Sequence, residues 1–379
     1  MITDADNENH NANATDTQAL PLIPTELWQT IFGHLGINAS DVAQVSKQFL
    51  AAWRTGVVGV RVHIPRAHSL SFLLEDHFNS FPNLKFVDLC DNNAYFSRTP
   101  SARELALTRP FISLHLTLTS HIRLSDVAAF LAQHPRWAAA VTQVSIFASH
   151  SGFAPAWALI RLLPNLVTLR LSGFSDVTDD RLRDLCRLPS LRQLAVIMCT
   201  GFTGEGLDAM AHPDSGIQSL ELRHTSLSGD QLAHLSQHPE LQKLTLAGCS
   251  LVKSQDLCHL RSMPALKVLS LRENPQFDDA GLKLLAEQLP QLEMLDIAYC
   301  GSVGNAGLGE LVKLQQLSYL SLLGCCRFSE QAVHELAAQL PALTEVAAHR
   351  LLNMTGETMG VPRNAKDQPV TMTTSHRAI

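Results

Sequence analysis

The chain has 379 residues, of which 61 are leucine, and its hydrophobic content of 46% includes only 6% aromatic residues, so its apolar side chains are mostly aliphatic. A net charge of −6, without a concentrated basic segment, excludes a nucleic acid as partner. No run approaches the roughly 18 apolar residues that span a bilayer. The first basic residue is Lys47, so no Lys or Arg stands in the first 46 residues. We therefore expect neither a membrane anchor nor a secretory signal.

Residues 1–21 are polar and acidic, with too little apolar surface to fold, and we expect a disordered lead there. Residues 22–55 have the pattern of a small all-helical module. Pro24 favours a first helical turn, and a second short helix is expected from about residue 40. So short a module buries too little surface to be stable alone, so it must pack on something else. The apolar residues at helical spacing are Leu27, Ile31 and Leu35 in the first helix and Val42, Val45 and Phe49 in the second.

From residue 57 onward the sequence repeats itself every 24 to 30 residues. In each copy an apolar residue is followed by others three and five positions later, and by Cys, Asn or a small polar residue at position eight. The pattern resembles the leucine-rich repeat, in its cysteine-containing class. The twelve copies begin at Val57, Leu84, Phe111, Val141, Leu166, Leu191, Ile217, Leu241, Leu266, Leu292, Leu317 and Leu343.

This repeat predicts an α/β fold, a leucine-rich-repeat solenoid of about twelve units over residues 57–352. The LxL piece of each unit forms a strand whose alternate leucines point inward, so parallel strands line the concave face and short helices cover the convex face. Eight cysteines without a CxxC pair predict reduced thiols. Those at the eighth repeat position are expected to serve as turn residues rather than as a metal or redox site.

Residues at offsets two, four and six of each strand should point onto the concave face, and the seventh should lie at its edge. A mixture of charge with Arg and Tyr is typical of a protein-binding patch. The alternative is a solvated face that binds no partner. The predicted substrate-binding residues are Arg170, Glu221, Arg223, His224, Arg272, Glu273, Asp296, Tyr299 and Tyr319.

Nothing in the sequence indicates an enzyme. Walker, GxGxxG, HExxH and GxSxG motifs are absent, and the 17 histidines are scattered. His134, His212 and His238 each precede Pro at a repeat end, which favours helix-end residues over a metal site. We expect no catalytic residues, cofactor or metal. Residues 353–379 are predicted to be a disordered tail.

The helical module resembles an F-box, because IPTELWQTIFGHL and VSKQF match the two halves of that motif in order. It departs from the motif at Ile23, where Leu is usual, and in a spacing from Leu35 to Val45 that is one residue short. The alternative is an ordinary helical cap on the solenoid. The resemblance implies that the following residues contact a Skp-type adaptor of a cullin ligase: Pro24, Leu27, Ile31, Leu35, Val45 and Phe49.

The resemblance therefore implies a non-catalytic substrate receptor of a cullin-based ubiquitin ligase, whose concave face binds a target protein. The composition and the GLxxLA helices are also similar to F-box leucine-rich type III effectors of plant-pathogenic bacteria. That origin implies action in a host cytoplasm or nucleus, whereas the sequence otherwise indicates a cytoplasmic protein. The alternative function is a protein-binding scaffold or inhibitor with no link to ubiquitin.

Overall fold

The computed structural model describes residues 59–64, 86–91, 113–118, 124–148, 152–212, 215–236, 238, 240–348 and 362–373. The predicted lead and helical module at residues 1–55, and with them the six adaptor-contact residues, lie outside the described residues.

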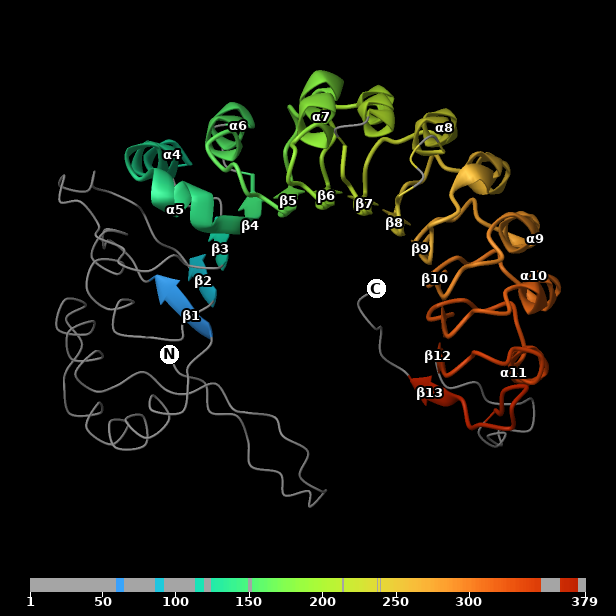
Figure 1. Ribbon diagram of the computed structural model, residues 1–379. Coiled ribbons are helices and arrows are strands. Elements are labelled where there is room, and N and C mark those ends of the chain that lie inside the picture. The colour runs from blue at the N-terminus through green and yellow to red at the C-terminus, as the bar shows by residue number, and fades with distance from the viewer. Residues whose placement is uncertain are drawn as a thin grey trace, which may run out of the picture.

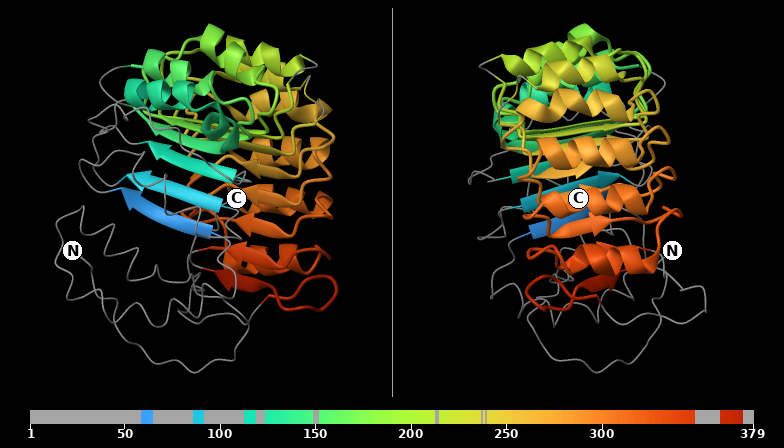
Figure 2. Two further views of the ribbon diagram at one scale, coloured as in Figure 1. Left: turned by 60° about the vertical axis from the view of Figure 1, so that its left-hand side comes forward. Right: turned by 90° about the vertical axis from the view of Figure 1, so that its right-hand side faces the viewer.

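The described chain forms one thirteen-stranded sheet in which neighbours in sequence are also neighbours in space. Figure 1 shows the strands along the inner side of an arch and the helices along its outer side, and the side views in Figure 2 show the strands stacked in one direction. The strands are β1 (Gly59–Ile64), β2 (Phe86–Asp91), β3 (Ser113–Leu118), β4 (Val141–Phe147), β5 (Thr168–Ser172), β6 (Gln193–Ile197), β7 (Ser219–Arg223), β8 (Lys243–Ala247), β9 (Val268–Ser270), β10 (Met294–Asp296), β11 (Tyr319–Ser321), β12 (Glu345–Ala347) and β13 (Thr371–Thr373).

Short helices return the chain from one strand to the next. α7 begins after Thr178 and α11 after Ser329, whose side chains accept hydrogen bonds from the backbone N–H of Arg181 and Ala332. The helices are α4 (Leu124–Gln133), α5 (Pro135–Ala140), α6 (Ala154–Ile160), α7 (Asp179–Cys186), α8 (Leu232–Leu235), α9 (Asp279–Gln288), α10 (Asn305–Glu310) and α11 (Glu330–Ala337). The 3₁₀ segments are η3 (Glu205–Ala211), η4 (Gly229–Gln231), η5 (Ser254–Ser262) and η6 (Leu311–Lys313).

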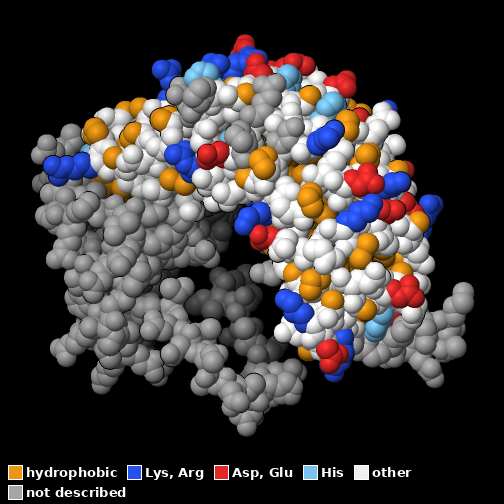
Figure 3. All heavy atoms as spheres, turned by 45° about the vertical axis from the view of Figure 1, so that its right-hand side comes forward, with side chains coloured by type: hydrophobic (Ala, Val, Ile, Leu, Met, Phe, Trp, Pro, Cys, Tyr) orange, Lys and Arg blue, Asp and Glu red, His pale blue; other side chains and the backbone are white. Residues whose placement is uncertain are grey.

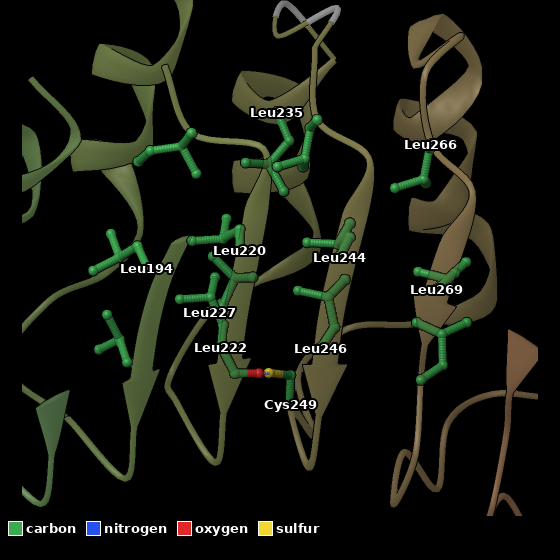
Figure 4. Close-up of a cluster of buried hydrophobic side chains, with 14 of the residues drawn as sticks. Leu194, Leu220, Leu222, Leu227, Leu235, Leu244, Leu246, Cys249, Leu266 and Leu269 are labelled. Carbon is green, nitrogen blue, oxygen red and sulfur yellow. Dashed lines mark hydrogen bonds between the residues drawn. The ribbon is translucent and has the colours of Figure 1, made fainter. Parts of the chain in front are cut away.

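The core is a continuous stack of leucines between the sheet and the helices. Leu194, Leu220, Leu244 and Leu269 are register partners in successive parallel strands, and all are 0–1% exposed. Figure 4 shows these side chains in one row that runs from repeat to repeat. Full burial of one leucine stabilises the fold by ~1.5–3 kcal/mol. The repeated LxL pattern therefore accounts for the solenoid.

The eighth position of the repeat supplies a hydrogen-bond donor to the preceding repeat. Asn274 Nδ2 donates to the Leu246 carbonyl at 2.6 Å and to that of Leu271 at 2.8 Å. Thiols occupy the same place in other repeats, where the Cys300 Sγ lies 3.1 Å from the Leu271 carbonyl and the Cys249 Sγ lies 3.5 Å from that of Leu222 (Figure 4). These buried side chains are structural, as the sequence predicted.

The structure differs from the sequence prediction at the predicted tail. Residues 362–373 continue the solenoid, because β13 pairs in parallel with β12 and Val370 is fully buried. Asn364, which precedes β13, donates through its Nδ2 to the Leu343 carbonyl at 3.1 Å. The segment escapes detection in the sequence because the leucines of the LxxLxL pattern are missing there.

Candidate binding face

Most of the predicted substrate-binding residues lie near one another on the concave side, between β5 and β10. Arg170 is in β5, and Glu221 and Arg223 are in β7, while Arg272 lies two residues after the end of β9. Alternation along each strand directs leucines into the core and leaves these polar residues on the opposite face. On the surface seen in Figure 3, basic and acidic side chains lie interspersed rather than in patches of one sign.

The first of two ion-pair networks joins β5 to β7. The Arg170 guanidinium lies 3.7 Å from a carboxylate oxygen of Glu221, and Arg223 pairs with the other oxygen of the same carboxylate. Ala195 in β6 is the register partner of both Arg170 and Glu221. Because its methyl group is small, the Arg170 side chain can reach across that strand.

The second network lies at the carboxyl ends of the strands. His224 Nε2 is 3.5 Å from a Glu273 oxygen, and Glu273 accepts a hydrogen bond from Arg272 Nε at 2.8 Å. The guanidinium of Arg272 lies 4.8 Å from the centre of the Tyr299 ring, in a cation–π contact. The four side chains thus hold one another in place while remaining partly exposed.

Left-handed backbone recurs at offset seven of the repeat, just past the end of the strand. Met198, His224, Glu273 and Tyr299 have φ between 49° and 60°. A non-glycine residue there costs ~1–3 kcal/mol, and such positions cluster at functional sites. We call these four residues the strand-end ridge. The same position is glycine at residues 173, 248 and 324, also with positive φ.

The glycines make room for the bulky ridge residues. A methyl group on Gly248 would lie 2.3 Å from His224 Nδ1, and one on Gly324 would lie 2.3 Å from the Tyr299 ring. Each ring therefore lies over the glycine of the following repeat. At this position two bulky residues stand between successive glycines, and this spacing is part of how the ridge is built.

Sequence reasoning missed two exposed apolar side chains of this face. Phe147 is 39% exposed and Met198 57% exposed, beside the more polar Ser172 and Gly173 of the intervening repeat. Their offsets of six and seven in their repeats are the signal that could have identified them. With the half-exposed Tyr299, they give the face apolar anchors at both ends of the charged networks.

Asp296 and Tyr319 lie apart from the exposed networks. Each is only 1% exposed. The Asp296 carboxylate accepts hydrogen bonds from Ser270 Oγ and from the Ala298 backbone N–H, both at 3.0 Å. As substrate contacts, these two residues stay predictions.

Several of the described cysteines are buried in the solenoid. Burial raises the pKa of Cys300 to about 12 and that of Cys325 to about 11, so both thiols stay protonated near neutral pH. Among the described residues, no group of three or more His, Cys, Asp or Glu side chains could hold a metal ion. His238 is buried beside the end of α8, and burial lowers its pKa.

Parallel strands supplied one per repeat, a leucine core and a donor at the eighth position together define a leucine-rich-repeat solenoid. No family model matches the chain. Similar solved structures include the mouse RP105/MD-1 complex, with 18% identity, a TM-score of 0.46, and 76% of this chain and 50% of that one covered. The chain thus spans half the length of the RP105 structure. None of the helices in the described residues is long and apolar enough to cross a membrane.

Two further structures are similar to this chain over most of both lengths. One is the yeast Rad7 and Elc1 complex, with 14% identity, a TM-score of 0.47, and 92% of this chain and 91% of that one covered. The other is internalin InlF from Listeria monocytogenes, with 13% identity, a TM-score of 0.46, and coverages of 85% and 94%. At these identities the likeness concerns the fold alone.

Proposed function

We propose that the concave face and its strand-end ridge bind a target protein. The observation that carries this proposal is the cluster of Arg272, Glu273, His224 and Tyr299, which is exposed and yet fixed by its own contacts. Arg and Tyr are enriched among the residues that dominate protein interfaces. Side chains already held in place lose less conformational entropy on binding.

The proposed role of this target binding is substrate selection for a cullin-based ubiquitin ligase. Residues 22–55 would dock on a Skp-type adaptor, and the solenoid would hold the target nearby, so that the ligase partners carry out ubiquitin transfer. The F-box resemblance of that segment supports this role. The resemblance to type III effectors supports a host cytoplasm or nucleus as the working compartment.

The second candidate is a protein-binding scaffold or inhibitor without any link to ubiquitin. The same cluster of Arg272 and Tyr299 favours it equally, since target binding alone requires no adaptor. The two candidates differ only in what residues 22–55 do.

Target binding is tested by comparing proteins captured from a cell extract by three forms of the chain. Arg272→Ala/Tyr299→Ala removes the cation–π contact of the second ion-pair network. The control, Arg181→Ala/Asp184→Ala, removes an ion pair on the convex side, in which the Arg181 guanidinium lies 3.2 Å from the Asp184 carboxylate. A protein captured by the wild type and the convex variant, but at least tenfold less by the concave variant, supports the proposal. Equal capture by all three forms contradicts it.

A further inference from the structure

Charge is divided unevenly along the concave strands. Strands β4 to β8, which lie side by side in Figure 1, carry three basic residues, Arg170, Arg223 and Lys243. Their one acidic residue is Glu221, so their net charge is +2. Strands β9 to β13 carry two acidic residues and no basic one. We call β4 to β8 the basic strands, in a chain whose net charge is −6.

Two of the basic side chains converge on the one carboxylate. Glu221 pairs with Arg170 through one oxygen and with Arg223 through the other. The Arg170 and Arg223 side chains are 44% and 33% exposed, whereas that of Glu221 is 15% exposed. Two guanidinium groups carry about ten N–H donors, and one carboxylate accepts about four hydrogen bonds. The two arginines therefore have donors and positive charge for a further carboxylate, and Glu221 holds them in position to bind it.

Exposed apolar side chains lie beside the two arginines. Phe147 in β4 is the register partner of Ser172 in β5, and Met198 directly follows β6. Phe147 and Met198 are 39% and 57% exposed, and the small Ser172 and Gly173 stand at the same offsets in the repeat between them. β4 and β6 are two strand spacings apart, which is about 9.6 Å. The surface over β5 therefore has room for one apolar side chain of a partner.

We propose that the basic strands bind an extended segment of the target protein that presents an Asp or Glu carboxylate close to an apolar side chain. The carboxylate pairs with Arg170 and Arg223, and the apolar side chain lies over Ser172 between Phe147 and Met198. This inference rests on the proposed binding of a target by the concave face, and it adds the chemistry of the bound segment.

Distances across the sheet set the spacing within that segment. Arg223 lies two strands from Ser172 in the same row of register partners, which is about 9.6 Å. Residues two and three positions apart in an extended chain are separated by about 7 Å and about 10 Å. The carboxylate therefore stands two or three positions from the apolar residue.

The extent of the basic strands favours a short acidic segment over a long polyanion. β4 to β8 span four strand spacings, about 19 Å, which is the length of about six extended residues. A longer polyanion running along the sheet would reach Asp296 in β10 and Glu345 in β12 and be repelled there.

The test selects binders of the purified full-length chain from a displayed library of random dodecapeptides. Peptides recovered on the wild type are expected to be enriched in Asp or Glu two or three positions from Leu, Met or Phe. Arg170→Glu should lower recovery of these peptides at least tenfold. The matched control is Arg181→Glu on the convex side, where the side chain is also 44% exposed, and it should leave recovery unchanged. Circular dichroism checks that both variants are folded.

A second pair of variants tests the apolar part of the surface. Phe147→Ala/Met198→Ala should abolish the enrichment of apolar residues while the enrichment of Asp and Glu remains. Leu251→Ala alters a loop leucine that is 53% exposed, and it should change neither enrichment.

The outcomes separate this inference from target binding itself. Peptides that require Arg272 and Tyr299 but show no acidic preference would overturn the inference and leave target binding by the concave face standing. Recovery of no peptides, or recovery that Arg170→Glu does not lower, would overturn it too. So would wild-type dimers in sedimentation that Arg170→Glu dissociates, because a second copy of the chain would then be the occupant.

Discussion

The imidazole ring of His224 lies over the α-carbon of Gly248, so closely that a methyl group on Gly248 would fall 2.3 Å from Nδ1. The backbone of Gly248 is left-handed, with φ at 65°. The ridge thus depends on a residue that contributes no side chain to it. Even the addition of one methyl group at Gly248 is therefore expected to destabilise the fold.

Gly248→Ala is therefore expected to lower the free energy of unfolding by ~1–3 kcal/mol, since it combines left-handed backbone strain with a steric clash. Chemical denaturation followed by circular dichroism measures the change. The matched control is Gly309→Ala in α10, where an added methyl group meets no atom within 4 Å and helix propensity favours Ala by ~1 kcal/mol. The argument fails if both substitutions have the same effect.

Asn274→Ala should lower the free energy of unfolding by ~1–3 kcal/mol, because the carbonyls of Leu246 and Leu271 lose a buried donor. Asn274→Cys should cost less, since thiols fill this position in neighbouring repeats. Denaturant titration of both variants is the measurement. If Asn274→Cys proves as destabilising as Asn274→Ala, the donor role assigned to the eighth position is wrong.

Acid should weaken the lateral contacts between repeats. Burial acts to raise the pKa of Asp179, but backbone hydrogen bonds from Thr203, Gly206 and Gly204 outweigh it, so the pKa is lowered from 3.8. A lowered folded-state pKa contributes stability above about pH 4, and this contribution is lost as pH falls through the folded value. The melting temperature of the wild type should drop below pH 4.

Asp179→Asn is the test of that assignment. The variant cannot gain a proton at this site, so its melting temperature should fall less between pH 5 and pH 3 than that of the wild type. It should also be less stable than the wild type at pH 7, because a neutral amide accepts the hydrogen bonds of Thr203 and Gly204 more weakly. Identical pH profiles for the two proteins would contradict the assignment.

The cysteines should divide into two groups under native alkylation. Cys258 and Cys326 are exposed, whereas Cys300 and Cys325 are buried with pKa values raised to about 12 and about 11. Brief treatment with iodoacetamide at pH 7.5 should modify Cys258 and Cys326 first, as measured by peptide mass spectrometry. Rapid modification of Cys300 in the folded chain would show that the thiol is not a buried turn donor.

The strands were predictable because the leucine pattern is regular. The first twelve strands each begin at the predicted repeat start or two residues after it. The thirteenth was missed because Pro369 and Met372 stand where the pattern would have leucines. Asn364, which precedes β13 and donates to the Leu343 carbonyl, is likewise not marked by that pattern.

The candidate face was predictable only in outline. Strand alternation correctly put Arg170, Glu221 and Arg223 on one side, because offset alone determines direction. It could not tell that Tyr319 would be covered and Tyr299 half-exposed. A repeat offset gives the direction of a side chain but not its exposure, which is 1% for Tyr319 and 47% for Tyr299.

The central claim is that residues 22–55 link a target-binding solenoid to a ubiquitin ligase, and binding of the purified full-length chain to a eukaryotic Skp adaptor tests it most directly. Pro24→Ala/Leu27→Ala alters the adaptor segment, and Arg223→Ala/Arg272→Ala alters the concave face. The account predicts adaptor binding by the wild type and the concave variant and none by the helix variant, with all three folded by circular dichroism. Absence of wild-type binding at tens of micromolar would contradict the ligase role and leave the scaffold or inhibitor as the better account.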